Sequence, residues 1–265
     1  MAKKKKVGIE VSDAKQAREL ILTESSPFNM LEAYKAARTN LIFTMNKSHE
    51  NKAIVVTSAM ANDGKTTSCI NLAITFAQTG SKVIVIDSDM RNPSVHRYMK
   101  GVKNAPGLSN VLGGFNTIEE SIQKAEEYNN LYIMSAGVIP PNPSELIYSD
   151  AIDNLLRELS KDFDYIFVDS PPLGIVTDAL ILGKRTLGIA LVVRQDATRK
   201  DAIKDVLNDC KFNETKVLGF ILNGATSENG YRYGKYGKYG KYGGYGYGYG
   251  YGQTAEAVKK STENK

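Results

Sequence analysis

Side chains that could handle a phosphate gather in a short glycine-containing segment of the sequence. Ala59 to Thr66 (AMANDGKT) fits a P-loop, except that alanine replaces the first glycine. In such loops, backbone N–H groups and the N-terminus of the following helix cradle phosphates. Lys65 could then reach the β- and γ-phosphates, and the Thr66 hydroxyl could bind Mg²⁺. The segment follows an apolar run and precedes a helical pattern, which is the context a P-loop requires.

Two further segments place carboxylates directly after apolar runs. Asp87 and Asp89 follow Val83 to Ile86, and Asp169 follows Tyr165 to Val168. Carboxylates at the end of a buried strand are costly unless water, a cation or a metal satisfies them. Asp169 therefore matches a Walker B carboxylate. A capped turn explains the Asp87–Asp89 pair when it is taken alone, whereas the P-loop nearby favours binding of Mg²⁺ or handling of a proton.

The elements that must position these residues alternate between strands and helices. Short apolar runs rich in β-branched residues predict strands at Lys52–Ser58, Lys82–Ile86, Leu131–Ser135, Asp164–Val168, Leu187–Val193 and Val217–Leu222. Helical periodicity and stop signals predict helices at Met30–Met45, Lys65–Gln78, Asp150–Ser160 and Lys200–Cys210. This alternation predicts an α/β fold of the P-loop NTPase type, with a mostly parallel sheet covered by helices on both faces. Ligands then bind beyond the carboxyl ends of the strands.

The composition divides the chain into three predicted parts. Residues 1–50 form an N-terminal segment with a helix, 51–227 form the P-loop domain, and 228–265 form a tail rich in glycine and tyrosine. So much glycine makes ordering of the backbone entropically expensive, so the tail is expected to be disordered. It contains nine tyrosines: Tyr231, Tyr233, Tyr236, Tyr239, Tyr242, Tyr245, Tyr247, Tyr249 and Tyr251.

Charge and hydropathy set bounds on where the chain works. The formal net charge is +5, and Lys3–Lys6 form a basic cluster. This cluster serves solubility or attracts the chain to an anionic membrane surface or acidic partner, whereas no nucleic-acid recognition motif accompanies it. No apolar run approaches the roughly 18–20 residues that span a bilayer, so the chain is expected in the cytoplasm. Cys69 and Cys210 have no metal-type spacing, so both are expected to be reduced, structural thiols.

The motifs together resemble the bacterial tyrosine kinases that control capsule and exopolysaccharide synthesis, especially the cytoplasmic kinase subunits of Gram-positive bacteria. The resemblance runs from about Glu32 to the tail. Its most specific element is the doubled aspartate of Ile86–Arg91 (IDSDMR). Gly107–Leu112 (GLSNVL) and Pro140–Leu146 (PPNPSEL) also look like family sequence and lie outside the phosphate motifs.

The resemblance implies a role for each site residue. The catalytic residues would be Lys65, Asp87 and Asp89, with Asp87 near the tyrosine hydroxyl, although the division of roles between the two aspartates stays open. Mg²⁺ would be held by Thr66, Asp89 and Asp169. ATP would be bound by Ala61, Asn62, Asp63, Gly64, Lys65, Thr66 and Thr67, together with Asn223.

Two positions, Asn223 and Asp178, leave alternatives open, and two others, Asn62 and Met60, depart from the patterns of related proteins. Asn223 either reads the adenine edge or simply forms an Asn-Gly turn. Asn62 occupies a position that is usually glycine in the family, and Met60 stands where the ATPases that partition DNA or place division sites carry a signature lysine. Asp178 is either a helix cap or a switch residue.

A helix near the N-terminus resembles the family's oligomerisation motif. Glu32, Lys35 and Arg38 lie along one helical side, although lysine replaces the first arginine and cannot form its bidentate fork. The alternative is a solvated helix face.

The nine tail tyrosines are predicted phosphate acceptors, because the glycines leave each one unhindered and able to extend into a neighbouring subunit's site. Each phosphate adds about −1.5 to −2 charges, so phosphorylation would reverse the tail's charge and loosen an oligomer. The resemblance also implies a transmembrane adaptor that recruits the chain to the inner face of the membrane, and an opposing phosphotyrosine phosphatase. Two rival functions remain: an ATPase switch without kinase activity, and a scaffold modified by another kinase.

Overall fold

The computed structural model describes residues 14–45 and 52–225. Contacts within the chain divide it into Met1–Ala225 and Thr226–Lys265, and only the first unit contains described residues. The Lys3–Lys6 cluster and all nine predicted acceptor tyrosines lie outside the described residues. The predicted boundaries of the three parts therefore stay predictions.

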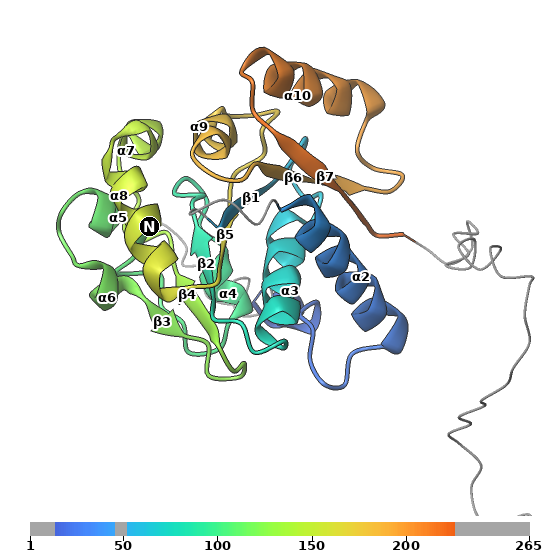
Figure 1. The fold of residues 1–265 in the computed structure, drawn as a ribbon, viewed down its shortest axis with the longest axis horizontal. Coiled ribbons are helices and arrows are strands. Elements are labelled where there is room, and N and C mark those ends of the chain that lie inside the picture. Colours follow the sequence, from blue (N-terminus) through green and yellow to red (C-terminus); the bar gives the residue numbers. More distant parts are fainter. Residues whose placement is uncertain (1–13, 46–51, 226–265) are drawn as a thin grey trace, which may run out of the picture. The chain divides into compact units, whose positions relative to one another are not determined.

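One sheet of seven strands forms the centre of the first unit (Figure 1). Its strand order is β3-β4-β2-β5-β1-β6-β7, and every neighbouring pair is parallel except β3 with β4. The strands are β1 (Ala53–Ser58), β2 (Val83–Asp87), β3 (Gln123–Lys124), β4 (Leu131–Met134), β5 (Tyr165–Asp169), β6 (Ile189–Arg194) and β7 (Val217–Asn223). The predicted α/β fold with a mostly parallel sheet is confirmed.

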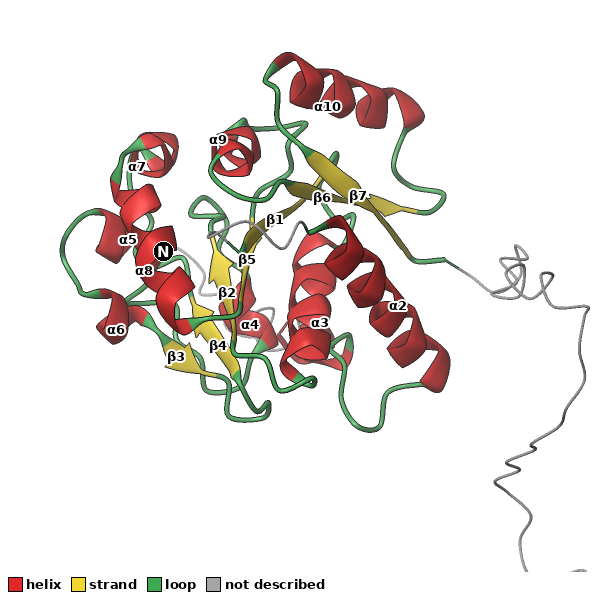
Figure 2. Cartoon of the chain, viewed as in Figure 1, coloured by secondary structure: helices red, strands yellow, loops and turns green. Residues whose placement is uncertain are grey.

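Helices cover both faces of the sheet (Figure 2). One face carries α2 (Phe28–Thr44), α3 (Lys65–Ala77) and α4 (Val95–Tyr98). The other carries α5 (Leu108–Leu112), α6 (Ile118–Ser121), α7 (Pro143–Tyr148), α8 (Ala151–Asp162), α9 (Asp178–Lys184) and α10 (Lys200–Phe212). Among the described residues, no helix has the length and apolar character needed to cross a bilayer.

The central strands explain why the apolar runs predicted them well. All six residues of β1 are buried, and its four apolar residues alternate between two hydrophobic clusters on opposite faces of the sheet. Ala53 and Val55 pack into one cluster, and Ile54 and Val56 into the other. A strand buried on both faces has no polar side, so its sequence is a continuous apolar run.

The predicted long elements are confirmed with small shifts at their ends. The helix predicted from Met30 begins at Phe28, and the strand predicted from Leu187 begins at Ile189. The sequence does not predict the short elements β3, α4, α5, α6, α7 and α9, because a strand of two residues and helices of four to seven residues are too short to establish a period. Cys69 and Cys210 are free and buried.

Three adjacent strands bring the phosphate motifs to one edge of the sheet. In the sheet order, β5 lies between β2 and β1. Asp87 on β2 is in register with Asp169 on β5, and Asp169 is also in register with Val56, two residues before the end of β1. Because the strands are parallel, their carboxyl ends meet at the same edge, which is where the P-loop begins.

Candidate functional site

The P-loop connects β1 to α3 through two residues in the left-handed region. Gly64 has φ of 90° and directly precedes Lys65, the first residue of α3. Asn62 has φ of 66°, a conformation that asparagine tolerates better than most residues. Asparagine at the position expected to be glycine is therefore compatible with the loop. Ala61 and Asn62 are exposed, and Thr67 is partly buried.

Side chains from β6, β7 and the connection after β6 hold this loop in place. The Thr198 hydroxyl donates to Asp63 Oδ1 at 2.8 Å, and the Asn223 amide donates to the Asp63 carbonyl at 2.8 Å. Arg194 donates to the Asn62 carbonyl at 3.0 Å. The Asn223 amide thus supports the loop, a role that sequence reasoning missed, while its contact with adenine stays a prediction.

Glycine at residue 64 suits both the left-handed backbone there and the close approach of the Asn223 amide, which a Cβ atom would push away from the Asp63 carbonyl. A Cβ atom added at Gly64 would lie 2.0 Å from Asn223 Nδ2, whereas a Cβ atom at Gly80, which has the same φ of 90°, would meet nothing within 4 Å.

We expect Gly64→Ala to weaken ATP binding by about tenfold or more, equivalent to ~1.4 kcal/mol. Gly80→Ala should cost only the left-handed strain of about 1–2 kcal/mol in folding. Calorimetric ATP titration and thermal melts of both variants measure this, and equal ATP affinities would contradict it.

Lys65 lies among the carboxylates that the sequence placed at three separate strand ends. Its Nζ atom is 3.5 Å from Asp89 Oδ2 and 3.5 Å from Asp169 Oδ2. The Thr66 hydroxyl donates to Asp169 Oδ2 at 2.7 Å. Lys65, Thr66, Asp89 and Asp169 therefore meet, as the three motifs predicted they would.

Asp87 joins the same group but faces backbone donors. Its Oδ2 atom accepts from the N–H groups of Ser94 at 2.9 Å and Val95 at 3.0 Å, and its Oδ1 atom accepts from Asp89 N–H at 3.1 Å. The Ser94 hydroxyl lies 3.3 Å from the Thr66 hydroxyl. Ser94 is thus a site residue that the sequence analysis missed, and no motif spacing indicated it.

Burial changes the acid–base character of this group. Desolvation and the Asp169 carboxylate raise the pKa of Asp87 to about 7, against the opposing effect of the backbone donors and of Lys65. Burial likewise raises the pKa of Asp169, although Lys65 and Thr66 oppose the rise. Burial alone would lower the pKa of Lys65, but the three carboxylates outweigh it, and the pKa is raised. Lys65 is therefore a permanent cation beside an aspartate that titrates near neutral pH.

The residues present also fit a magnesium ion. Asp169 is fully buried, and its Oδ1 atom has no hydrogen-bond partner. Within the described residues, no group of three histidine, cysteine, aspartate or glutamate side chains is spaced to hold a metal. Proteins bind Mg²⁺ through one or two carboxylates while substrate phosphates and water supply the other ligands. An unpartnered buried oxygen beside the Thr66 hydroxyl is consistent with such a ligand set.

The predicted oligomerisation residues lie on α2, away from the carboxylates. Lys35 Nζ is 2.8 Å from Glu32 Oε1, and Arg38 donates to the Thr75 carbonyl of α3 at 2.6 Å. Both contacts lie within one chain. They neither require nor prevent contact with a second copy, so the oligomerisation role stays a prediction.

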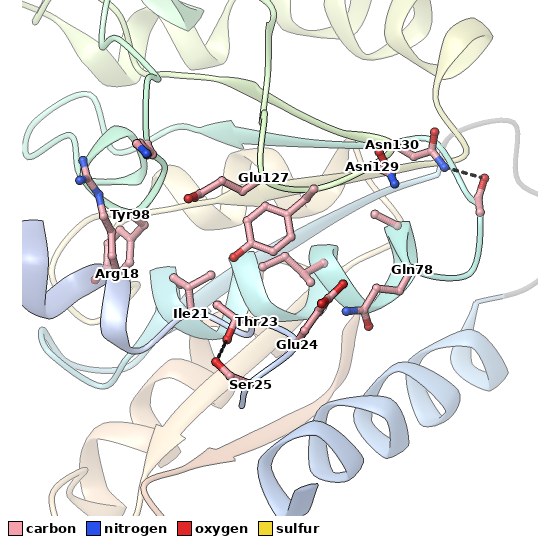
Figure 3. A pocket seen from close by; sticks show the side chains of 15 residues that line it. Arg18, Ile21, Thr23, Glu24, Ser25, Gln78, Tyr98, Glu127, Asn129 and Asn130 are labelled. Atoms are coloured by element: carbon pink, nitrogen blue, oxygen red, sulfur yellow. Dashed lines mark hydrogen bonds between the residues drawn. The ribbon is translucent and has the colours of Figure 1, made fainter. Parts of the chain in front are cut away.

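A pocket of about 910 Å³ lies near the other end of α3 and contains none of the predicted site residues. Figure 3 shows its lining residues as sticks, among them Thr23, which is hydrogen-bonded to Ser25 at 2.9 Å. Its lining mixes acidic, basic, amide and aromatic groups. We place the functional site at the carboxylate group instead, because reactive groups converge there.

Comparison with known proteins also identifies a nucleotide-binding domain of the P-loop type. Residues 51–211 match the family described as AAA domain. The chain is 36% identical over 222 residues to the tyrosine-protein kinase YwqD of Bacillus subtilis, covering 83% of this chain and 91% of that protein.

Two solved structures are also similar to this chain. The kinase domain of the Escherichia coli tyrosine kinase ETK matches with a TM-score of 0.71 and 31% identity, covering 83% of this chain and 80% of that one. The chimerical protein CapA2B2 matches with a TM-score of 0.70 and 33% identity, covering 78% of this chain and 89% of that one. Together with the convergence of Lys65, Thr66, Asp87, Asp89 and Asp169, these likenesses show that the chain belongs to the bacterial tyrosine-protein kinases built on a P-loop AAA domain.

Proposed function

We propose that this kinase transfers the γ-phosphate of ATP to tyrosines of its own tail, mainly in a neighbouring copy. The observation that carries the proposal is the meeting of one cation and three carboxylates beside the P-loop. Phosphoryl transfer has a loose transition state, so positioning and charge stabilisation supply most of the catalysis. Lys65 is the residue that neutralises charge on the transferred phosphoryl group.

Asp87 is the group best suited to take the proton of the tyrosine hydroxyl. A tyrosine hydroxyl has an ordinary pKa near 10, and the raised pKa of Asp87, about 7, makes it a stronger base than an exposed aspartate. Asp89 instead lies next to Lys65. This contrast supports Asp87 as the base and Asp89 as a ligand to Mg²⁺.

Thr66, Asp89 and Asp169 would hold the Mg²⁺. When bound, the ion supplies positive charge that offsets the negative charge of the β- and γ-phosphates. Asp169 contributes its unpartnered Oδ1 atom, and Lys65 keeps its position between the two carboxylates. The cofactors of the reaction are thus ATP and Mg²⁺.

The tail provides the acceptors in this proposal. Residues 231–251 carry nine tyrosines separated by glycines, three lysines and one arginine, and a glycine-rich segment of this kind reaches far without steric hindrance. Several phosphates would replace the basic charge of the tail with negative charge, and neighbouring tails would then repel each other. Phosphorylation would thereby loosen an oligomer assembled through Glu32, Lys35 and Arg38.

The wider role follows from the family. The relatives include proteins named CapB and CpsD, and a solved relative is the chimera CapA2B2. We infer that this chain controls the polymerisation and export of a capsular or extracellular polysaccharide. A transmembrane partner of the CapA type would recruit it to the inner face of the membrane, and a phosphotyrosine phosphatase would reverse its phosphorylation.

Transfer between copies can be tested by mixing two forms of the chain. A Lys65→Met variant of distinguishable mass should gain tail phosphotyrosine when wild-type protein, ATP and Mg²⁺ are added, because it lacks a working site but keeps its acceptors. Incubation of the variant without wild-type protein is the control. Phosphate confined to the wild-type copies would indicate transfer within one chain, and release of free phosphate alone would favour the ATPase switch.

A further inference from the structure

Three polar side chains form a second contact chain beside the carboxylate group. Arg91 Nη2 donates to the Ser144 hydroxyl at 2.6 Å, and the Ser144 hydroxyl donates to Asp178 Oδ1 at 2.6 Å. Arg91 Nη2 also lies 3.6 Å from Asp178 Oδ2. The Ser144 hydroxyl accepts one hydrogen bond and donates the other, so the order of donors and acceptors is consistent along the chain.

Asp178 is the buried end of this contact chain of Arg91, Ser144 and Asp178. Its side chain is 1% exposed, whereas that of Arg91 is 39% exposed. A buried carboxylate requires a hydrogen-bonded or charged partner, and here Ser144 and Arg91 provide both. Asp178 is the first residue of α9, and its Oδ1 atom accepts from the Ser144 hydroxyl, while Thr177 occupies the N-cap position, which argues against a simple helix cap.

The three residues form contacts between the segments that follow three neighbouring strands. Arg91 follows β2, Ser144 lies in α7 after β4, and Asp178 follows β5. In the sheet, β2 lies between β4 and β5. The contact chain therefore spans the same edge of the sheet that carries the catalytic carboxylates.

Arg91 is part of the turn that carries those carboxylates. It lies two residues after Asp89, whose Oδ1 atom accepts from Asn92 N–H at 3.0 Å, and three residues before Ser94, whose N–H is bonded to Asp87. Residues 88–94 thus contact Lys65 through Asp89 on one side and Asp178 through Arg91 on the other. Arg91 is the residue of this turn that contacts Ser144 and Asp178.

We propose that Asp178, acting through Ser144 and Arg91, is a positioning residue for phosphoryl transfer that holds Asp89 beside Lys65 and Asp87 against its backbone donors. This inference rests on the phosphoryl transfer proposed above. The polar partners of Asp178 are Ser144 and Arg91, neither of which belongs to the P-loop, so its loss should affect the rate of transfer much more than the affinity for ATP. Displacement of a reacting group by about 1 Å can reduce a rate by about 100-fold.

The test measures kcat, KM, ATP affinity and melting temperature for purified full-length variants. Asp178→Asn should lower kcat by about 10- to 100-fold while the calorimetric Kd for ATP changes less than about threefold. Ser144→Ala removes the bridging hydroxyl but keeps Arg91 as the charged partner of Asp178. It therefore serves as the second variant if Asp178→Asn folds poorly. Arg91→Lys keeps the charge but loses the planar guanidinium, so this variant should retain less than half of the wild-type kcat.

The double variant separates a connected chain from independent effects. If the three residues act as one unit, Ser144→Ala combined with Asp178→Asn should lower kcat no further than Asp178→Asn alone. Asp153→Asn is the matched control, because Asp153 on α8 pairs at 3.5 Å with Arg185, the residue that follows α9, rather than with the turn after β2. It should keep kcat within about twofold of wild type.

Three outcomes would overturn the inference. These are unchanged kcat in both single variants, multiplicative losses in the double variant, and a loss of kcat matched by an equal loss in the control. Wild-type protein in the same assay distinguishes the two proposals. If wild type transfers no phosphate, the proposed function fails as well, whereas active wild type with unaffected variants refutes only the positioning role.

Discussion

Replacing Lys65 with methionine should reduce phosphoryl transfer by at least about 100- to 1000-fold, the range seen when one preorganised charge-stabilising group is removed. Lys65 is the cation placed 3.5 Å from both Asp89 and Asp169. Methionine keeps much of the side-chain length but removes the charge. The buried carboxylates then lose their counterion, and the transferred phosphoryl group loses the positive charge that would stabilise it.

The measurement is the rate of phosphotyrosine formation by protein purified from a host without other tyrosine kinases. Lys161→Met is a matched control, since Lys161 pairs with Glu158 on the exposed surface of α8, with a side chain 62% exposed. It should behave as wild type, because exposed ion pairs contribute little. Phosphotyrosine at the wild-type rate in Lys65→Met would show that another group or another kinase transfers the phosphate.

Replacing Asp87 with asparagine should lower the rate of phosphoryl transfer and should also reduce the loss of folding stability that occurs as the pH rises. Loss of a general base lowers a rate by about 100-fold or more, so kcat should fall by that amount. The pKa of Asp87 is raised to about 7, so folding opposes its ionisation, and stability is lost as the pH rises through that value. Asparagine removes this loss. The melting temperature of the variant relative to wild type should therefore be higher at about pH 8 than at about pH 5.

Two measurements check this prediction. The wild-type kcat/KM for ATP-dependent transfer should fall as the pH drops through about 7, because the base becomes protonated. Asp201→Asn controls for loss of a carboxylate, because Asp201 on α10 has a side chain 65% exposed. A flat wild-type pH profile with an Asp87→Asn variant that retains full activity would remove Asp87 from the chemistry.

Much of the site could be predicted from sequence because its residues mark the ends of elements. A P-loop must follow a strand and begin a helix, and Asp87 and Asp169 end apolar runs that could only be buried strands. Parallel pairing then forces the carboxyl ends together. Asp87 and Asp169 consequently lie in register, and Lys65 lies beside Asp169.

The supporting residues could not be predicted because their partners are far apart in the chain. Asn223 and Asp63 are 160 positions apart, and Arg91 and Ser144 are 53 apart. Hydrogen bonds between connections leave no periodic pattern in the sequence, since they depend on how the short helices pack. The contact between Asp178 and Ser144 is one such bond, so the sequence alone leaves the role of Asp178 open.

The most direct test of the central claim is to locate the phosphate after purified wild-type protein has reacted with ATP and Mg²⁺. Peptide mass spectrometry should find phosphotyrosine among the nine tyrosines of residues 231–251, and none there in Lys65→Met treated in parallel. Production of ADP and free phosphate without phosphotyrosine in the tail would contradict the claim and identify the protein as an ATPase switch.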